Sequence, residues 1–241
     1  ATHTALDPTS MHRGIHQSLS KLLDAPGYVV MLSEPGDSGA FDFVYRVLGS
    51  ERGSDGPRAM PRSRTARVAR SGKTEYLTAA DTARLVDEGE IELYDAFAGA
   101  WLGAPLIVND TVIGVVALLH PCEEDPYTQG EIAVFEYVCQ QIAVAIDRGR
   151  VLEDLQREKR LFQALMDNVP DTIYLKDAES RFVRVNDIGG RALGLADGNE
   201  ALGLTDAHWH DEPLAGRLRD EELEVMRTGQ PIVGRVDPGG S

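Results

Sequence analysis

The chain has 241 residues, of which 42% are hydrophobic and 26% are charged. This composition is typical of a folded globular protein with one large or two small domains. Asp and Glu number 39 against 24 Lys and Arg, so the net charge is −15 and the surface lacks the positive field that nucleic-acid binding requires. The longest apolar runs reach about half of the ~20 residues that a membrane helix needs, so we expect no membrane span in this segment.

The first 50 residues predict a helix followed by a β-hairpin. Apolar side chains recur at helical spacing over residues 11–23, and Pro26 with Gly27 marks the end of that helix. Two β-rich runs follow, and a segment of Gly, Pro, Asp and Ser joins them as the turn of an antiparallel hairpin. The predicted strands are residues 28–32 and 43–49.

The next segment alternates between turn-forming and regular patterns. Residues 50–63 are rich in Gly, Pro, Arg and Ser, and this composition predicts a mobile loop. A short helix is expected over residues 65–70, a strand over 75–77 and at least one helix within 82–97.

The strongest pattern of the first half lies between Trp101 and His120. Two nearly continuous apolar runs, rich in β-branched residues, lie on either side of Asn109 and Asp110, which fit the two-residue turn of a tight hairpin. Because these runs do not alternate with polar residues, we expect the hairpin in the middle of a sheet that is covered on both faces.

A helical pattern of about 40 residues begins near Thr128, which is predicted to form a capping box with Glu131. No proline interrupts the pattern before Pro170, and the length is far above the usual ~11–12 residues. The helix should therefore link two domains and pair with a second copy of itself. One heptad register is apolar early and poor late, which allows a coiled coil without requiring one. Its positions are Val138, Ile142, Ala145, Gly149, Leu152, Gln156, Lys159, Gln163 and Met166.

The pattern restarts after Pro170. Two strands joined by a turn are predicted over residues 172–176 and 182–186. Residues 187–228 predict helices and loops, and a last short strand is predicted over residues 232–236.

The most specific runs of the first half are YVVML, FVYRVLG, RVARSGKTEYL, LGAPLIVNDTVIGVVALLH and YTQGEIAVFEYVCQQIAVAIDR. Through them residues 10–150 resemble a GAF domain. Residues 162–236 are similar to the front of a PAS domain through LFQALMDNVPDTIYLKDAESRFVRVND, a Leu-Gly-Leu run and VMRTGQPIVG. Both resemblances imply a central antiparallel sheet with helices on its faces and a pocket.

Together the resemblances imply an α+β chain in three parts. A GAF-like sensor domain, with a central antiparallel sheet flanked by helices, covers residues 1–150, and a long connecting signalling helix covers 128–166. A partial PAS-like α/β unit covers 162–241. A PAS domain usually has five strands, and we expect only two and the start of a third here. The second unit should therefore be less stable than the first, or complete its sheet on a neighbour.

Motifs that could carry chemistry are weak. Ser71-Gly72-Lys73-Thr74 imitates the end of a phosphate-binding P-loop, but Arg67 stands where that motif needs a glycine, so the segment is interpreted as a turn before a strand. His208 and His210 have no third ligand nearby other than aspartates, so no metal site is predicted.

Cys122 and Cys139 form no zinc framework. Two cysteines are also too few for the GAF enzymes that reduce methionine sulfoxide, and Cys122 follows the wrong strand for bilin attachment. No nucleophile with a neighbouring base is evident, so no catalytic residue is predicted.

Three aromatic residues, Tyr94, Phe97 and Trp101, precede the central hairpin, in the segment that covers the ligand in GAF domains. They are candidates for a ligand-binding cage, and the alternative is that they fill the core beneath a helix. The comparable candidates in the PAS-like part are Tyr174, Asn186 and Trp209. The alternative for the asparagine is that it satisfies backbone groups at the end of a strand.

The resemblances imply a sensory module of a signal-transduction protein, of the kind found in two-component histidine kinases. A small molecule of unknown identity would bind the GAF pocket. The long helix would relay its effect to the PAS unit and to an output domain beyond Ser241. The module would be a cytoplasmic parallel homodimer, paired through its N-terminal and linking helices.

This segment would not itself be an enzyme, although the parent protein could be a histidine kinase or a cyclic-dinucleotide enzyme. The alternatives are a ligand-free dimerisation scaffold and a GAF-type redox enzyme.

Overall fold

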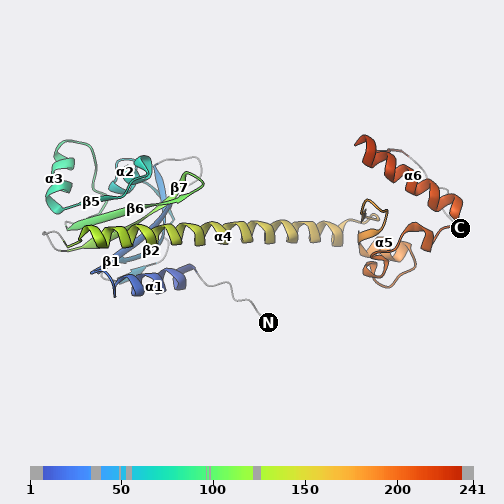
Figure 1. The fold of residues 1–241 in the computed structure, drawn as a ribbon, viewed down its shortest axis with the longest axis horizontal. Helices are drawn as coiled ribbons and strands as arrows, with labels where there is room; N and C mark the ends of the chain where they lie inside the picture. The colour runs from blue at the N-terminus through green and yellow to red at the C-terminus, as the bar shows by residue number, and fades with distance from the viewer. Residues whose placement is uncertain are drawn as a thin grey trace. The chain divides into compact units, whose positions relative to one another are not determined.

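The structure is a computed structural model of the chain (Figure 1). It describes residues 8–33, 39–48, 50–52, 56–95, 97, 99–121 and 126–234. The chain divides into two compact units, Ala1–Val151 and Leu152–Ser241, and one helix, α4 (Gln129–Asn168), has residues in both.

The first unit is built on one antiparallel sheet. Its strands are β1 (Gly27–Ser33), β2 (Ala40–Leu48), β3 (Ser50–Arg52), β4 (Pro57–Ala59), β5 (Glu75–Leu77), β6 (Ala100–Val108) and β7 (Thr111–His120). Within the described residues six of these strands follow the order β3-β2-β1-β7-β6-β5, and the seventh, β4, pairs with β2. The hairpin of β6 and β7 therefore lies inside the sheet, with β1 on one side and β5 on the other.

Two apolar cores cover the two faces of this sheet. One contains side chains of α1 (Pro8–Leu19) and of the first half of α4, and the other contains side chains of α2 (Arg64–Ser71) and α3 (Ala79–Asp87). On β7, Val116 and Leu118 belong to the first core, whereas Ala117 and Leu119 belong to the second. This alternation follows from the period of two along a strand and confirms that the hairpin is covered on both faces.

The turn between β6 and β7 has the predicted chemistry. Asn109 and Asp110 have φ angles of 48° and 61°, the left-handed conformation that a tight two-residue hairpin needs at both central positions. Asn and Asp tolerate this conformation better than most residues, so the local sequence selects the turn.

The loop predicted over residues 50–63 is wrong in part. β3 and β4 lie within it, and each pairs with β2, with Arg46 opposite Arg52 and Phe41 opposite Arg58. The edge of β2 supplies hydrogen-bond partners that the local composition could not reveal. Residues 53–55 of that expectation lie outside the described residues.

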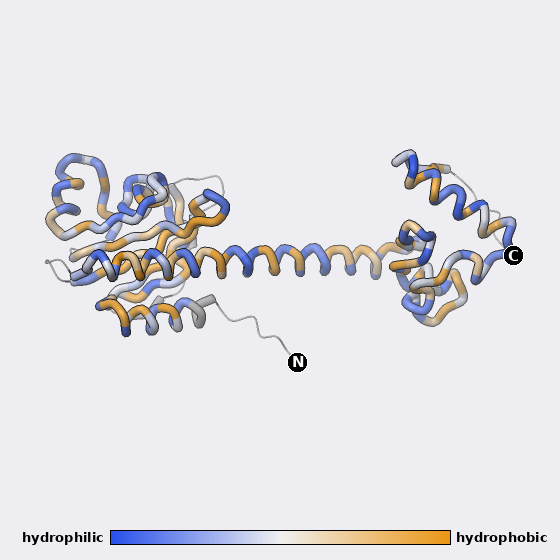
Figure 2. Tube along the Cα trace, viewed as in Figure 1, coloured by the Kyte–Doolittle hydropathy of each residue, from blue (hydrophilic) through white to orange (hydrophobic). Residues whose placement is uncertain are grey.

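The long helix α4 begins as predicted. The Thr128 side chain accepts from the Glu131 backbone N–H at 3.3 Å, and the Glu131 carboxylate accepts from the Thr128 N–H at 2.8 Å, so the capping box is confirmed. The helix is continuous for 40 residues. Figure 2 shows hydrophobic and hydrophilic residues alternating along its whole length.

Seven of the nine exposed large apolar side chains on α4 follow one heptad register, which we call the α4 stripe, and the other two, Leu152 and Leu161, lie outside it. Its members are Val134, Tyr137, Val144, Val151, Leu155, Phe162 and Leu165. The heptad considered from the sequence is a different register, and it is only partly exposed: Leu152 in its middle is 58% exposed. Ile142 and Met166 in that register are only 2% and 4% exposed, because each already packs inside its own unit.

The second unit is smaller. Its elements are β8 (Tyr174–Lys176), β9 (Phe182–Val185), α5 (Asp187–Ala192), η1 (Gly198–Ala201), η2 (Asp206–His208) and α6 (Glu212–Thr228). β8 and β9 form an antiparallel pair, as predicted. The strand predicted over 232–236 is not formed at residues 232–234, and residues 235–236 lie outside the described residues.

Candidate functional site

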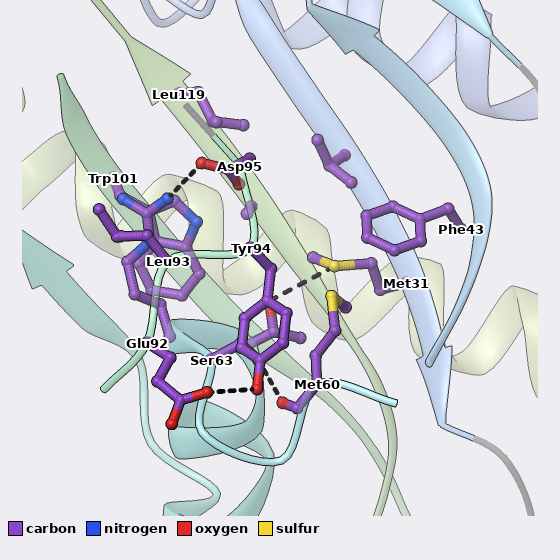
Figure 3. Close-up of a pocket in the computed structure, with 14 residues that line it drawn as sticks. Met31, Phe43, Met60, Ser63, Glu92, Leu93, Tyr94, Asp95, Trp101 and Leu119 are labelled. Atoms are coloured by element: carbon purple, nitrogen blue, oxygen red, sulfur yellow. Dashed lines mark hydrogen bonds and ion pairs between the residues drawn. The ribbon is translucent and has the colours of Figure 1, made fainter. Parts of the chain in front are cut away.

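A small cavity lies between the sheet of the first unit and the segments that precede α2 and β6 (Figure 3). Its volume is about 50 Å³. The strands contribute Val29, Met31, Phe43, Trp101, Ala117 and Leu119, and the two covering segments contribute Met60, Ser63, Arg64, Thr65, Glu92, Leu93, Tyr94 and Asp95. The floor is therefore apolar, and the polar groups come from the covering segments.

Arg64 is the buried charge of this cavity. Its side chain is only 5% exposed, and Nη2 donates to Asp95 Oδ1 at 3.1 Å. The guanidinium carbon also lies 5.5 Å from the centre of the Trp101 ring, which is cation–π distance. Arg64 is the first residue of α2, and Ser63 caps that helix by accepting from the Ala66 N–H at 3.0 Å. The cap and the helix start thus place the guanidinium beneath the covering segment.

The second terminal nitrogen of Arg64, Nη1, is buried and has no hydrogen-bond partner among the described residues. Burial lowers the pKa of Arg64, and the charge and hydrogen bond of Asp95 oppose this effect without cancelling it. The carboxylate is half-exposed, so it compensates the buried cation only in part. An unmatched donor of this kind costs free energy unless something accepts from it.

Polar contacts at the opening of the cavity hold the segment that covers it. Arg62 forms an ion pair with Glu92 at 3.1 Å and donates to the Gly89 carbonyl, while the Glu92 N–H donates to the Arg62 carbonyl at 2.8 Å. The Tyr94 hydroxyl donates to Glu92 at 3.0 Å, as Figure 3 shows. Partial desolvation and this carboxylate raise the pKa of Tyr94. The cover is thus held by polar contacts at its rim, in addition to the packing of Ile91 and Tyr94 on the apolar core.

The structure places two of the three predicted aromatic residues at the cavity. Tyr94 and Trp101 line it, whereas Phe97 packs against the same apolar core without lining the cavity. The Trp101 ring lies over Gly103, where an added Cβ would come within 2.1 Å of it. A glycine at that position is therefore needed for the ring to lie flat against the sheet.

The three predicted residues of the second unit do not form one site. Tyr174 lines a groove of about 520 Å³ between β8 and α6, and Trp209 does not line that groove. Both rings instead contact Phe182 edge to face, with centroid distances of 5.5 and 5.8 Å. Asn186 is 3% exposed and caps α5.

The side-chain amide of Asn186 bonds to the backbone through both of its polar atoms. Its Oδ1 accepts from the N–H groups of Ile173 and Gly189 at 3.0 and 2.8 Å, and its Nδ2 donates to the Asp171 carbonyl at 2.8 Å. These hydrogen bonds support the structural alternative for this residue, in which Asn186 satisfies backbone groups, and Oδ1 has no lone pair left for a ligand.

Sequence reasoning missed the two buried cations. Arg64 is one, and Lys176 is the other, with a side chain that is 7% exposed and paired with both Asp206 and Glu222. Burial alone would lower the pKa of Lys176, but the hydrogen bonds and charges of the two carboxylates raise it overall. Neither cation stands in a recognisable motif, because burial depends on segments distant in the chain.

The other singled-out motifs are structural where they can be seen. Gly72 has a φ of 62° and caps the C-terminus of α2, so Ser71-Gly72-Lys73-Thr74 is a turn before β5, as interpreted. A helix C-terminus carries partial negative charge and does not attract phosphate. His208 and His210 are exposed, Cys139 is a buried free thiol, and Cys122 lies outside the described residues.

No helix in the described part of the chain combines the length and the apolar character that crossing a membrane requires. Over the same ranges, no three potential metal ligands gather into a cluster.

Comparison with known proteins shows what the fold resembles. The GAF domain model matches residues 7–146, and a model described as PAS fold matches residues 166–238. The methanogenesis regulatory histidine kinase FilI of Methanothrix harundinacea is 31% identical over 84 residues, which are 35% of this chain and 9% of that protein. The chain thus spans only a small part of that relative's length.

Two solved structures are similar to the first unit. The GAF domain of a phosphoenolpyruvate-protein phosphotransferase from Coxiella burnetii has a TM-score of 0.50 and 12% identity, and the match covers 63% of this chain and 89% of that one. A methyl-accepting chemotaxis protein has a TM-score of 0.51 and 12% identity over 61% of this chain and 93% of that one. At this identity the likeness concerns the fold alone. The chain belongs to the GAF domain family, and a PAS fold follows its GAF domain.

Proposed function

We propose that the chain is the sensory part of a signal-transduction protein, in which the cavity beneath Glu92–Asp95 receives a small molecule and α4 carries the effect onward. GAF and PAS domains and the similarity to a histidine kinase support a sensory role. The output domain would be that of a two-component histidine kinase, and the PAS unit would stand between the cavity and that output.

One observation carries the proposal: a single strand, β7, touches both the cavity and α4. Ala117 and Leu119 line the cavity on one face. Val116 and Leu118 on the other face share a core with Phe135, Cys139 and Ile142 of α4. Because packed cores are not compressible, a solute that shifts the floor of the cavity must also move the surface on which α4 rests.

We propose that the module is a parallel homodimer paired along the α4 stripe. Over about nine turns between Val134 and Leu165, seven of the ten heptad positions are apolar and exposed, which is a seam that a second helix can cover. The two copies would then pass a change in α4 as a rotation or shift of one helix against the other. Pairing through the N-terminal helix α1 is part of the same proposal.

The dimer is tested by molar mass in solution. Light scattering after size exclusion should give twice the mass of the chain, and Leu155→Glu on the stripe should give the monomer mass, because a buried charge in the seam is costly. The matched control is Leu161→Glu, which is equally exposed but lies off the stripe. A wild-type monomer at high protein concentration would contradict the pairing.

The relay is tested by filling the cavity without a ligand. Ala117→Val adds two carbon atoms at the cavity floor and should change the hydrogen exchange of residues 132–146 of α4 severalfold. Thr82→Val, a buried change on the same face that does not line the cavity, should leave α4 exchange as it is. If Ala117→Val folds normally and α4 exchange is unchanged, the relay is wrong, and the chain is the ligand-free dimerisation scaffold that the α4 stripe alone would support.

We also propose that this segment regulates and does not catalyse. The hydroxyls that line the cavity are not poised as nucleophiles: Ser63 donates to the Met60 carbonyl at 2.8 Å and caps α2, Thr65 donates to the sulfur of Met31 at 3.4 Å, and Tyr94 donates to Glu92. A cytoplasmic location fits the buried free thiol of Cys139, since reducing compartments preserve thiols.

A further inference from the structure

We propose that the ligand of the cavity is a small carboxylate, of the size of acetate, held by the free Nη1 edge of Arg64. This inference rests on the proposed function of the cavity and adds the chemical class of the molecule that it receives. It is carried by three independent features: an unpartnered buried donor, the size of the space and the nature of its walls.

The donor comes first. Arg64 is 95% buried, lines the cavity, and presents Nη1 without a hydrogen-bond partner in the part of the chain that the structure describes. Among the described residues, its other terminal nitrogen, Nη2, makes a single ion pair, with Asp95 at 3.1 Å. A guanidinium is a planar fork that matches the two oxygens of a carboxylate, so one edge of this fork is still available.

Charge favours an anion over a neutral acceptor. Asp95 is half-exposed to water, and its Oδ1 is shared with the Phe97 N–H at 3.1 Å, so it offsets the buried cation incompletely. Glu92, the other acid at the mouth, is paired with Arg62. The N-terminus of α2 lies at the same cavity through Ser63, Arg64 and Thr65, and helix N-termini carry partial positive charge.

Size and walls define the rest of the molecule. A volume of about 50 Å³ suits a molecule of only a few heavy atoms, and acetate belongs to that size class. The strand residues that line the cavity include Val29, Met31 and Ala117, which carry no charge, so they suit a methyl or short alkyl end. A longer acid would fit only if the segment over residues 92–95 moved.

Asp95 makes the inference specific. The Asp95 carboxylate is paired with Arg64, so it repels the carboxylate of a ligand that binds to the same guanidinium. Removing that charge by Asp95→Asn should tighten the binding of an anion severalfold, while leaving the binding of a neutral solute nearly unchanged. Removing the donor by Arg64→Met should weaken anion binding by about tenfold or more.

The probes are acetate and acetamide, which have the same number of heavy atoms and differ in charge. Titration of the full chain at constant ionic strength is followed by the indole N–H signals of 15N-labelled tryptophan, because Trp101 lines the cavity and Trp209 lies in the second unit as an internal control. Acetate should shift the Trp101 signal saturably, with a dissociation constant no tighter than about tens of micromolar for so small a ligand. Acetamide should bind at least about tenfold more weakly.

Three results would overturn the inference: equal binding of acetamide, acetate binding unaffected by Arg64→Met, or no acetate binding at all. If Arg64→Met does not fold, acetate binding by Asp95→Asn is the test. Asp95 is half-exposed, so this variant should fold, and it should bind acetate more tightly than the wild type. Failure here leaves the sensory proposal standing whenever Ala117→Val still alters α4 exchange, because that experiment uses no ligand. If acetate does not bind and Ala117→Val leaves α4 exchange unchanged, both the carboxylate inference and the sensory proposal are wrong.

Discussion

The GAF unit and the PAS unit reach stability by different means. In the GAF unit a broad sheet is covered on both faces, and the side chains of its central strands are almost wholly buried. In the PAS unit, over the described residues, two short strands leave Tyr174, Leu175 and Val183 nearly half exposed. The apolar side chains that this unit buries there are Met166, Phe182, Ala201 and Ala215.

The difference teaches that the PAS unit depends on polar contacts where the GAF unit depends on packing. A sheet of two strands buries too little apolar surface to be stable by itself. Asn186 and the Lys176 pairs therefore fasten β8, β9, α5 and α6 to one another. Substitutions should accordingly be most costly at apolar positions in the first unit and at polar positions in the second.

The largest effect is expected in the GAF core. Leu102→Ala removes a fully buried side chain of β6 and should lower the free energy of unfolding of the first unit by about 2–5 kcal/mol. The matched change in the PAS unit is Leu223→Ala on α6. Because Leu223 is 43% exposed, this change should lower the free energy of unfolding far less. Urea unfolding read by hydrogen exchange in peptides of each unit measures both. Equal losses would erase the distinction between the units.

Acid should weaken the GAF unit through His12. This side chain is 2% exposed and stacks on Tyr45, and burial lowers the pKa of His12 from 6.5 to about 4. The unfolded chain takes up the proton first, so stability is complete above pH 6.5 and falls as the pH drops towards 4, by up to about 3 kcal/mol.

The check is the unfolding midpoint of the first unit between pH 7 and 4. His12→Phe keeps a ring against Tyr45 and removes the titration, so its midpoint should depend less on pH in this window. A variant with the same acid sensitivity as the wild type would show that other groups are responsible.

A smaller effect is expected at Asn186, whose hydrogen bonds hold elements of the PAS unit together. Asn186→Ala removes the cap of α5 and leaves the Ile173 N–H and the Asp171 carbonyl without their partner, which should cost the second unit about 1–3 kcal/mol. Asn186→Asp keeps the accepting oxygen and should cost less. Peptide-resolved hydrogen exchange of residues 171–192 measures the loss, and faster exchange in the GAF sheet would argue against two separate units.

The smallest effect is expected at high pH. The carboxylates of Asp206 and Glu222 raise the pKa of Lys176 despite its burial. The stability that this raised pKa supplies is complete at neutral pH and is lost as the pH rises past about 10.4, the ordinary pKa of lysine. Lys176→Arg should keep the second unit folded up to a higher pH than the wild type, since arginine stays charged there. Circular dichroism between pH 9 and 12 separates the two proteins.

Local chemistry was enough to predict much of the fold. The spacing of apolar residues marked the hairpin between Trp101 and His120, the Asn-Asp turn and the start of α4 at Thr128, because each of these depends on neighbours within a few residues. The strands β3 and β4 escaped prediction, since they form only because the edge of β2 is there to pair with them.

The sequence by itself determined the order of the two domains, the central hairpin and the long helix, and it pointed to Tyr94 and Trp101. Only the tertiary structure decided that Phe97 lies outside the cavity, that Arg64 and Lys176 are buried, and which register of α4 is left exposed. Periodicity reports which face of an element is apolar. Whether that face is covered, and which charge is enclosed with it, depends on segments far apart in the chain that meet only in the folded protein.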